Sequence, residues 1–300
     1  MTVKSPVTLS DNTKLIETVP INIIIEGYRK LLDMDVSEYF VGLHNIFIYE
    51  CLDTGFRFYY PENIFGNEKF YAELQTKDFY YNPWIWENKT ALKNIGAGSK
   101  ILEAGCGTGS FLEVMSKKGF NCTGLELNQA AVTVCQQKGL NVYKQLLEEH
   151  VTAHAEMYDV VCSFQVLEHV YDVNSFITTS LQCLKPGGKL IIAVPNNNPW
   201  YYKYDKLNTL NMPPHHSGLW NKKTFLQLPR FFPVKIIKIL HEPLNHRVPY
   251  VHVFLKHFKL NIFNKIFKSI PPGITNRALL PLTWLVQGKC VLAIFEKEKE

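Results

Sequence analysis

The amino-acid sequence predicts an α/β fold, in which a seven-stranded, mostly parallel sheet carries helices on both faces and follows an aromatic-rich N-terminal subdomain. From Trp84 onward, short apolar segments alternate with helical segments, which is typical of parallel strands joined by right-handed crossovers. The runs VVCSF and LIIAV are continuously apolar and suit central strands that are buried on both faces. Gly119 and Gly139 each stand just after a helical segment, where a left-handed residue closes the last turn.

The sequence predicts that residues 1–82 form a separate N-terminal cap. Residues 1–14 are polar and predict a frayed tail, whereas the chain from Tyr39 to Trp86 is dense in aromatic residues. NIFIYECLDTGFRFYYP (45–61) predicts two short strands around the turn LDTG, and NEKFYAELQ (67–75) predicts a short helix. Two interpretations stay open: the aromatic residues form the core of a small subdomain, or they form a wall that stacks on a ring-bearing acceptor.

Residues 83–300 predict one α/β domain with an insertion at 245–285. The basic, apolar sequence of the insertion favours a lid or a dimer contact over a membrane-surface helix. The expected strands are KILEAG (100–105), CTGLEL (122–127), NVYKQ (141–145), YDVVCSF (158–164), GKLIIAVP (188–195), VKIIKIL (234–240) and GKCVLAIFEK (288–297). The expected helices are PWIWENKTALKNI (83–95), SFLEVMSKKG (110–119), NQAAVTVCQQKG (128–139), VNSFITTSLQCL (173–184) and NKKTFLQL (221–228).

The composition narrows the class of protein. The net charge of +5 comes from scattered lysines, without the Lys/Arg-rich run that marks nucleic-acid binding. The 7 cysteines contain no C-x-x-C pair, which indicates reduced thiols in a cytoplasm rather than a disulfide frame or a zinc site. No stretch approaches about 18 uncharged apolar residues, so we expect no stable membrane insertion. The polar N-terminus lacks the apolar core of a signal peptide.

The segment ILEAGCGTGSFL (101–112) carries the strongest chemical signal. A strand leads into Gly105, Gly107 and Gly109, and a helix with its positive N-terminal potential follows directly. A dinucleotide-binding loop has the spacing G-x-G-x-x-G, whereas the spacing here is G-x-G-x-G. Glu103 precedes the first glycine by two residues, and its carboxylate would repel a diphosphate but attract a cationic amino acid.

The string E-x-G-C-G-T-G closely resembles the first motif of class I S-adenosylmethionine-dependent methyltransferases. The resemblance extends over roughly residues 84–240 and the last strand. CTGLELN (122–128), YDVVCSFQVLEHV (158–170) and LKPGGKLIIAVPN (184–196) resemble further motifs of that family. Taken together with TGFRFYYP and LNMPPHH, these motifs resemble those of a bacterial subgroup that modifies glycans and small molecules.

This resemblance implies a Rossmann-like fold and S-adenosylmethionine as the cofactor. Glu103 and the glycine loop would hold its methionine end, and Glu126 would accept from both ribose hydroxyls. The adenine contact falls after the third strand, where Leu146, Leu147 and Glu148 are alternatives. The expected cofactor-binding residues are Glu103, Gly105, Cys106, Gly107, Gly109, Glu126, Leu127, Leu147, Phe164 and Gln165, the last two bordering the methyl-transfer cleft.

The stretch LNMPPHHSGLW (210–220) is the candidate for the acceptor side of the site. It follows the fifth strand, and its prolines restrict the backbone. His169, His215 and His216 are the candidate catalytic residues, because histidine has a pKa suited to a general base. The alternatives are that Glu168 and His169 order a loop, and that one of the paired histidines packs under Trp220. A metal held by His215, His216 and a carboxylate is a further alternative, but none is assigned, because adjacent side chains rarely converge on one ion.

These features predict an S-adenosylmethionine-dependent methyltransferase of a bacterial cytoplasm. The expected reaction is an in-line displacement that methylates a small-molecule or glycan-precursor acceptor at oxygen. The alternatives are a scaffold protein without catalysis, or methylation of nitrogen or carbon on another acceptor. The expected partner is the acceptor alone, without nucleic acid, and a homodimer is left open.

Overall fold

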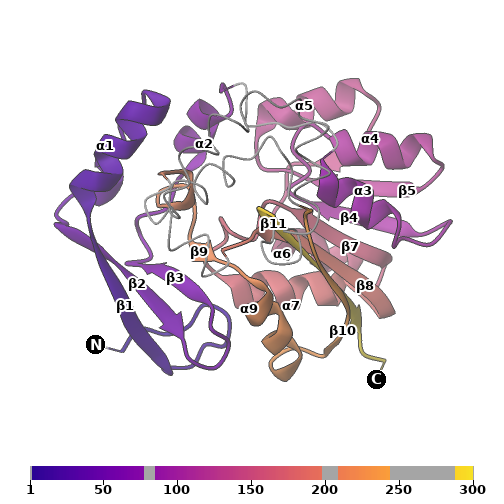
Figure 1. The fold of residues 1–300 in the computed structure, drawn as a ribbon. Helices are drawn as coiled ribbons and strands as arrows, with labels where there is room; N and C mark the ends of the chain where they lie inside the picture. The colour runs from indigo at the N-terminus through magenta and orange to yellow at the C-terminus, as the bar shows by residue number, and fades with distance from the viewer. Residues whose placement is uncertain (1, 78–84, 198–208, 244–287, 300) are drawn as a thin grey trace, which may run out of the picture.

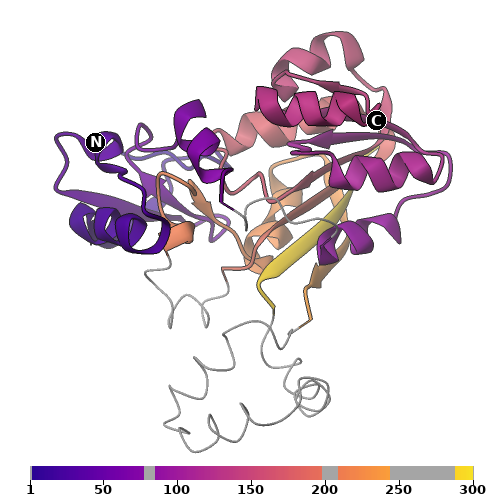
Figure 2. The same cartoon turned by 90° about the horizontal axis from the view of Figure 1, so that it is seen from above.

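The computed structural model describes residues 2–77, 85–197, 209–243 and 288–299. Two β-sheets lie beside each other in this part of the chain, in two perpendicular views (Figures 1 and 2). One is a 7-stranded sheet of order β10-β11-β8-β7-β4-β5-β6, and the other is a 4-stranded sheet of order β1-β2-β3-β9. The site described below lies where segments of the two sheets meet.

The 7-stranded sheet confirms the predicted α/β fold. Strand β11 runs antiparallel to both β8 and β10, and the other pairs are parallel. All the expected strands of this domain form, with slightly different ends. They are β4 (Lys100–Ala104), β5 (Asn121–Leu125), β6 (Val142–Tyr143), β7 (Tyr158–Phe164), β8 (Leu184–Pro195), β10 (Val234–His241) and β11 (Cys290–Lys297).

Helices cover both faces of this sheet, because successive residues of its strands point to opposite sides. In β4, Ile101 belongs to the hydrophobic core under α3, α4 and α5, whereas Leu102 belongs to the core under α6, α7 and α9. These helices are α3 (Trp86–Leu92), α4 (Ser110–Lys117), α5 (Gln129–Gln137), α6 (Leu147–His154), α7 (Val173–Cys183) and α9 (Lys222–Gln227). Gly119 and Gly139 follow α4 and α5 with φ of 83° and 73°, as the sequence predicts.

The smaller sheet joins the N-terminal region to a distant segment. The predicted hairpin forms from β2 (Asn45–Cys51) and β3 (Arg57–Tyr60), and the predicted short helix is α2 (Glu68–Leu74). β1 (Thr13–Pro20) and α1 (Ile21–Leu32) precede them. The fourth strand, β9 (Gly218–Leu219), comes from LNMPPHHSGLW and pairs with β3. The stretch LNMPPHHSGLW is therefore fastened to the N-terminal sheet.

One local prediction is wrong, and one helix was not predicted. Residues 1–14 are not a frayed tail, because Val3 and Val7 are buried in the main core. Asn174 of α7 holds this segment by donating its side-chain amide to the Val7 carbonyl at 2.8 Å and its backbone N–H to the Pro6 carbonyl at 2.9 Å. The segment after β6 also forms helix α6, which the sequence analysis did not predict.

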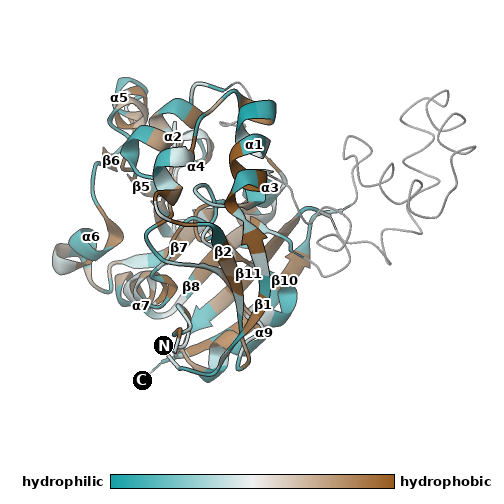
Figure 3. Cartoon of the chain, turned by 90° about the vertical axis from the view of Figure 1, so that its left-hand side faces the viewer, coloured by the Kyte–Doolittle hydropathy of each residue, from teal (hydrophilic) through white to brown (hydrophobic). Residues whose placement is uncertain are grey.

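No described helix combines the length and apolarity needed to cross a membrane. Figure 3 shows that the described helices carry both hydrophilic and hydrophobic residues. The predicted insertion at 245–285 lies outside the described residues, as does Pro83. The lid or dimer role of the insertion stays a prediction.

Candidate active site

The glycine loop between β4 and α4 has a backbone that only glycine adopts easily. Gly105, Gly107 and Gly109 have φ of 74°, 53° and 78°. A Cβ on Gly105 would collide with the side chain of Val166, and one on Gly109 would lie 2.9 Å from the Cys135 sulfur. The loop is therefore shaped by close packing against the segment after β7 on one side and against α5 on the other.

Glu103 is a buried carboxyl group at the end of β4. Its Oε2 atom has no hydrogen-bond partner among the described residues. Burial raises the pKa of Glu103 well above its ordinary value, and the nearby Cys135 and Glu126 raise it further. A buried carboxyl without a partner is costly unless a cation or donor meets it. The position therefore fits the ammonium group of an amino-acid ligand.

Glu126 follows β5 and is held in place by backbone N–H groups. Its Oε2 accepts from the N–H of Gly107 at 2.9 Å, and its Oε1 accepts from the N–H groups of Leu127 and Asn128 at 2.9 and 2.8 Å. An ionised carboxylate has about four acceptor positions and three are used here, so Oε2 is the atom that can still accept from a ligand hydroxyl. These bonds fix Glu126 against the glycine loop, at the edge where β4 and β5 end. The side chain of Leu127 next to it is exposed.

Three other predicted cofactor-binding residues are buried and pack against neighbouring residues. Cys106 is buried, and its contact with Cys135 and its burial raise its thiol pKa, which fits loop packing rather than nucleophilic chemistry. Leu147 is buried in the main core at the start of α6. Phe164 packs edge-to-face on Phe111 with ring centroids 5.0 Å apart. Their roles toward the cofactor stay predictions.

Gln165 leads to a residue that the sequence analysis missed. It has a φ of 56°, and its side-chain amide donates to Glu87 Oε1 at 3.0 Å. Glu87 of α3 is buried, and burial raises its pKa to about 7. The one signal in the sequence is a carboxylate between apolar residues in WIWENKTAL, which does not by itself distinguish a buried face from an exposed one.

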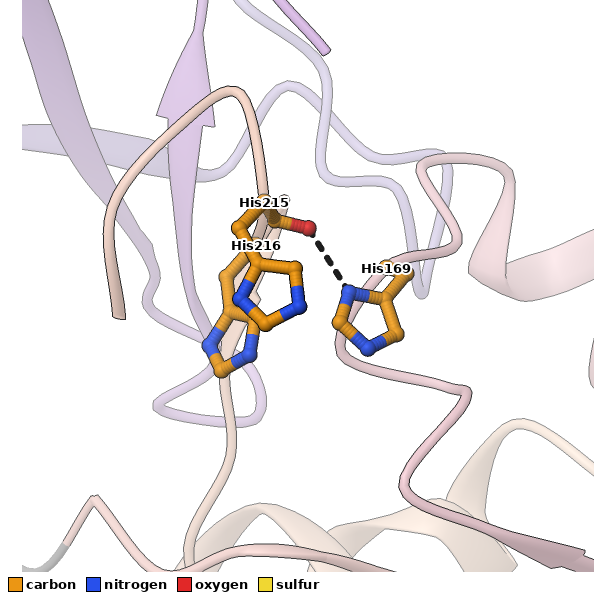
Figure 4. A group of neighbouring side chains, drawn as sticks. All are labelled: His169, His215 and His216. Carbon is orange, nitrogen blue, oxygen red and sulfur yellow. Dashed lines mark hydrogen bonds between the residues drawn. The ribbon is translucent and has the colours of Figure 1, made fainter. Parts of the chain in front are cut away.

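The three candidate histidines come together in the structure (Figure 4). His169 lies five residues beyond β7, and His215 and His216 lie just before β9. The ring centroids are 4.5 Å apart for His169 and His215, 4.9 Å for His169 and His216, and 4.6 Å for the adjacent pair. Neighbouring Val166 contacts the glycine loop and accepts the His169 N–H at 2.8 Å. The cluster is thus connected through Val166 to the glycine loop.

The N-terminal sheet and its helices brace the loop that carries His215 and His216. Tyr28 and Tyr59 donate their hydroxyls to the carbonyls of Met212 and Asn211 at 2.9 and 2.8 Å. Tyr71 donates its hydroxyl to the His215 carbonyl at 3.0 Å. Trp220 packs on the Phe56 and Phe225 rings, with centroid distances of 4.5 and 5.2 Å.

Burial keeps these histidines neutral. It lowers the pKa of His169 to about 4, and it lowers the pKa values of His215 and His216 well below the ordinary value. Glu168 is buried beside them, and burial raises its pKa well above the ordinary value, with Glu87 adding to the rise. The cluster is therefore uncharged near neutral pH, and its imidazoles are weak proton acceptors.

Comparison with known proteins agrees with this geometry. The family described as a methyltransferase domain matches residues 84–233, half of the chain. The ubiquinone biosynthesis O-methyltransferase of Pseudomonas savastanoi is 30% identical over 185 residues, which are 55% of this chain and 73% of that protein. The protein of the same name from Cronobacter sakazakii is 37% identical over 107 residues, which are 34% of this chain and 44% of that protein.

The chain spans about half the length of the first curated relatives it matches. In fold it is similar to the solved structure of geranyl diphosphate C-methyltransferase from Streptomyces coelicolor, with a TM-score of 0.50 and 14% identity, over 70% of this chain and 75% of that chain. The sheet order, the glycine loop and the family match define the class of protein. The chain belongs to the class I S-adenosylmethionine-dependent methyltransferases.

Proposed function

We propose that the protein transfers a methyl group from S-adenosylmethionine to an oxygen atom of a small molecule. The observation that carries the proposal is the pair of carboxyl groups beside the glycine loop, Glu103 and Glu126. One is buried with an unpartnered oxygen, and the other is fixed on the loop by three backbone N–H groups. The curated relatives, which are named as O-methyltransferases, support oxygen as the methylated atom.

In this proposal the two carboxylates bind different parts of the cofactor. Glu103 receives the ammonium of the methionine moiety, and Glu126 accepts from the ribose. When bound, S-adenosylmethionine supplies a methyl group on a sulfonium, whose sulfur leaves as a neutral thioether. The task of the protein is then to align the acceptor oxygen with the methyl group and to remove the acceptor proton.

The acceptor would lie beside the histidine cluster, under the N-terminal cap of residues 1–82. The cluster is neutral, so its imidazoles can accept a hydrogen bond from an acceptor hydroxyl. The relatives support a small molecule as the acceptor, and they offer no support for a glycan precursor. The homodimer stays a prediction.

A binding and transfer experiment tests this function. Calorimetry with the full chain should show one-to-one binding of S-adenosylmethionine and no binding of NAD. Incubation with methyl-labelled cofactor and a panel of phenolic small molecules should yield a product heavier by one methyl group. Failure to bind S-adenosylmethionine would overturn the proposal. Binding without transfer to any acceptor, in the panel or in a cell extract, would favour the scaffold alternative.

A further inference from the structure

The ring nitrogens of the three histidines lie close enough together to be considered as ligands of one metal ion. One ring nitrogen of each lies within 4.8 Å of those of the other two. Figure 4 shows the rings gathered from two separate loops. Two of the rings belong to adjacent residues, and the reason that they lie together is local. The N–H groups of His215 and His216 both point to the Met212 carbonyl, at 3.1 and 3.3 Å, so a tight turn places both side chains on one side.

Oxygen acceptors lie beside Nδ1 of all three rings, and the His169 ring is also hydrogen-bonded to the Gln165 backbone. Nδ1 of His169 lies 2.7 Å from the His215 carbonyl oxygen, and Nδ1 of His215 lies 2.9 Å from the Leu210 carbonyl oxygen. A carbonyl oxygen only accepts, so an Nδ1 that faces one donates to it. A neutral ring protonated at Nδ1 has its lone pair on Nε2.

The third ring obeys the same rule through an asparagine. Nδ1 of His216 lies 2.9 Å from Asn211 Oδ1, and the amide nitrogen of Asn211 donates to Asn197 Oδ1 at 2.6 Å. The Asn211 oxygen therefore faces the histidine and accepts from it. A ring held at Nδ1 by an oxygen acceptor is the usual setting of a metal-binding histidine, because it orients the ring and raises its basicity toward the metal.

A buried carboxyl oxygen without a partner in the described part of the chain is the second observation that points to a cation. Glu168 is buried, its Oε2 has no hydrogen-bond partner among the described residues, and its Oε1 lies 3.9 Å from His169 Nε2. Neutral imidazoles impose no charge penalty on an incoming ion, and an ionised Glu168 would offset part of its charge. We propose that His169, His215 and His216 bind one divalent transition-metal ion of the zinc class through their Nε2 atoms, with Glu168 as the charge partner.

This site would give the cluster a role that the histidines cannot have alone. A neutral imidazole is a good metal ligand. Three protein ligands leave a fourth position open, as in catalytic zinc sites. The next step rests on the proposed function. The acceptor oxygen would occupy the fourth coordination position of the ion, and its hydroxyl proton would become more acidic. The proton passes to solvent, and the oxygen then attacks the methyl carbon as the carbon–sulfur bond breaks.

Metal binding alone tests the site, without cofactor or acceptor. The full chain, stripped with a chelator, is titrated with Co²⁺, followed by its visible absorption, and then with Zn²⁺ in competition. We expect one ion per chain with the spectrum of a four-coordinate site. His216→Gln should weaken binding at least tenfold, and Asn211→Ala should weaken it by roughly 10- to 100-fold, because the loss of an outer-shell partner has that effect. Circular dichroism should show that both variants remain folded.

His154→Ala is the matched control, because His154 lies on α6 outside the cluster and should leave the affinity unchanged. Absence of stoichiometric binding would overturn the site, and so would unchanged binding by a triple variant of the three histidines. Failure of the proposed function would look different, because the ion would bind while S-adenosylmethionine did not. Full methyl transfer in the presence of a chelator would overturn the catalytic role of the ion and leave the methyltransferase proposal intact.

Discussion

The proposed cofactor side and the proposed acceptor side of this site are built in opposite ways. The cofactor side is local, because Glu103, the glycine loop and Glu126 lie on two neighbouring strands and the loops that follow them. The acceptor side joins His169 to His215, 46 positions apart, and it is braced by Tyr71 and Tyr28, 144 and 184 positions from the carbonyls they bind. One side therefore depends on a short motif, and the other depends on the docking of two sheets.

The largest expected effect breaks the cofactor side alone. Glu126→Ala should weaken S-adenosylmethionine binding on the order of 100-fold or more, because it removes the charge-assisted bonding to the ribose and one of the bonds that hold the glycine loop. Calorimetry measures the affinity. Glu113→Ala, which removes an exposed carboxylate from α4, should leave it unchanged. Unchanged affinity in Glu126→Ala would sink the assignment of the cofactor side.

The next largest effect concerns turnover without cofactor affinity, and so distinguishes the acceptor side from the cofactor side. His216→Ala should lower turnover by roughly 10- to 100-fold while the affinity for S-adenosylmethionine changes little, because the ring contacts the acceptor side only. Steady-state kinetics, with calorimetry on the same variant, gives both quantities. An equal loss of turnover and of cofactor affinity would indicate that the ring serves folding instead.

A pH titration sharpens the role of Glu103. The pKa of this carboxyl is raised in the free protein, so it is protonated at pH values where an ordinary carboxyl is ionised. Binding an ammonium group requires the ionised form, so a proton leaves on binding and the affinity should rise with pH, by up to about tenfold per pH unit. Calorimetry in buffers of different ionisation enthalpy measures the released proton. Glu103→Gln should flatten this pH dependence, and proton uptake in the wild type would contradict the assignment.

The smallest effect tests the brace between the two sheets. Tyr71→Phe removes the hydrogen bond to the His215 carbonyl and should reduce the free energy of unfolding by about 1 kcal/mol, with a modest loss of turnover. Urea unfolding measures the first quantity. Tyr39→Phe, which loses an exposed bond to Asn67, is the control and should leave turnover unchanged. Equal turnover in the two variants would mean that this contact does not position the cluster.

Local pattern was enough to predict much of the fold. The strand–helix alternation, the glycines that close α4 and α5, and the hairpin of β2 and β3 all form where the sequence indicates. Predictions failed where a partner elsewhere in the chain decides the outcome. Val3 and Val7 lie in a polar stretch whose burial depends on α7, and Glu87 is buried because α3 turns it toward Gln165.

The histidines illustrate the same division. The composition of LNMPPHHSGLW predicts an acceptor-side loop, but adjacent side chains normally diverge, so the placement of both rings in one cluster could not be predicted. The turn onto the Met212 carbonyl and the pairing of β9 with β3 decide that arrangement.

The α/β pattern and the glycine-loop motif can be predicted from sequence, because glycine conformations, helix ends and strand ends depend on neighbouring residues. The folded chain is needed to see which groups are buried, which acceptors the histidine nitrogens meet, and which residues face one another across the two sheets. Burial, pKa values and side-chain convergence depend on atoms that are distant along the chain, and a motif does not contain them.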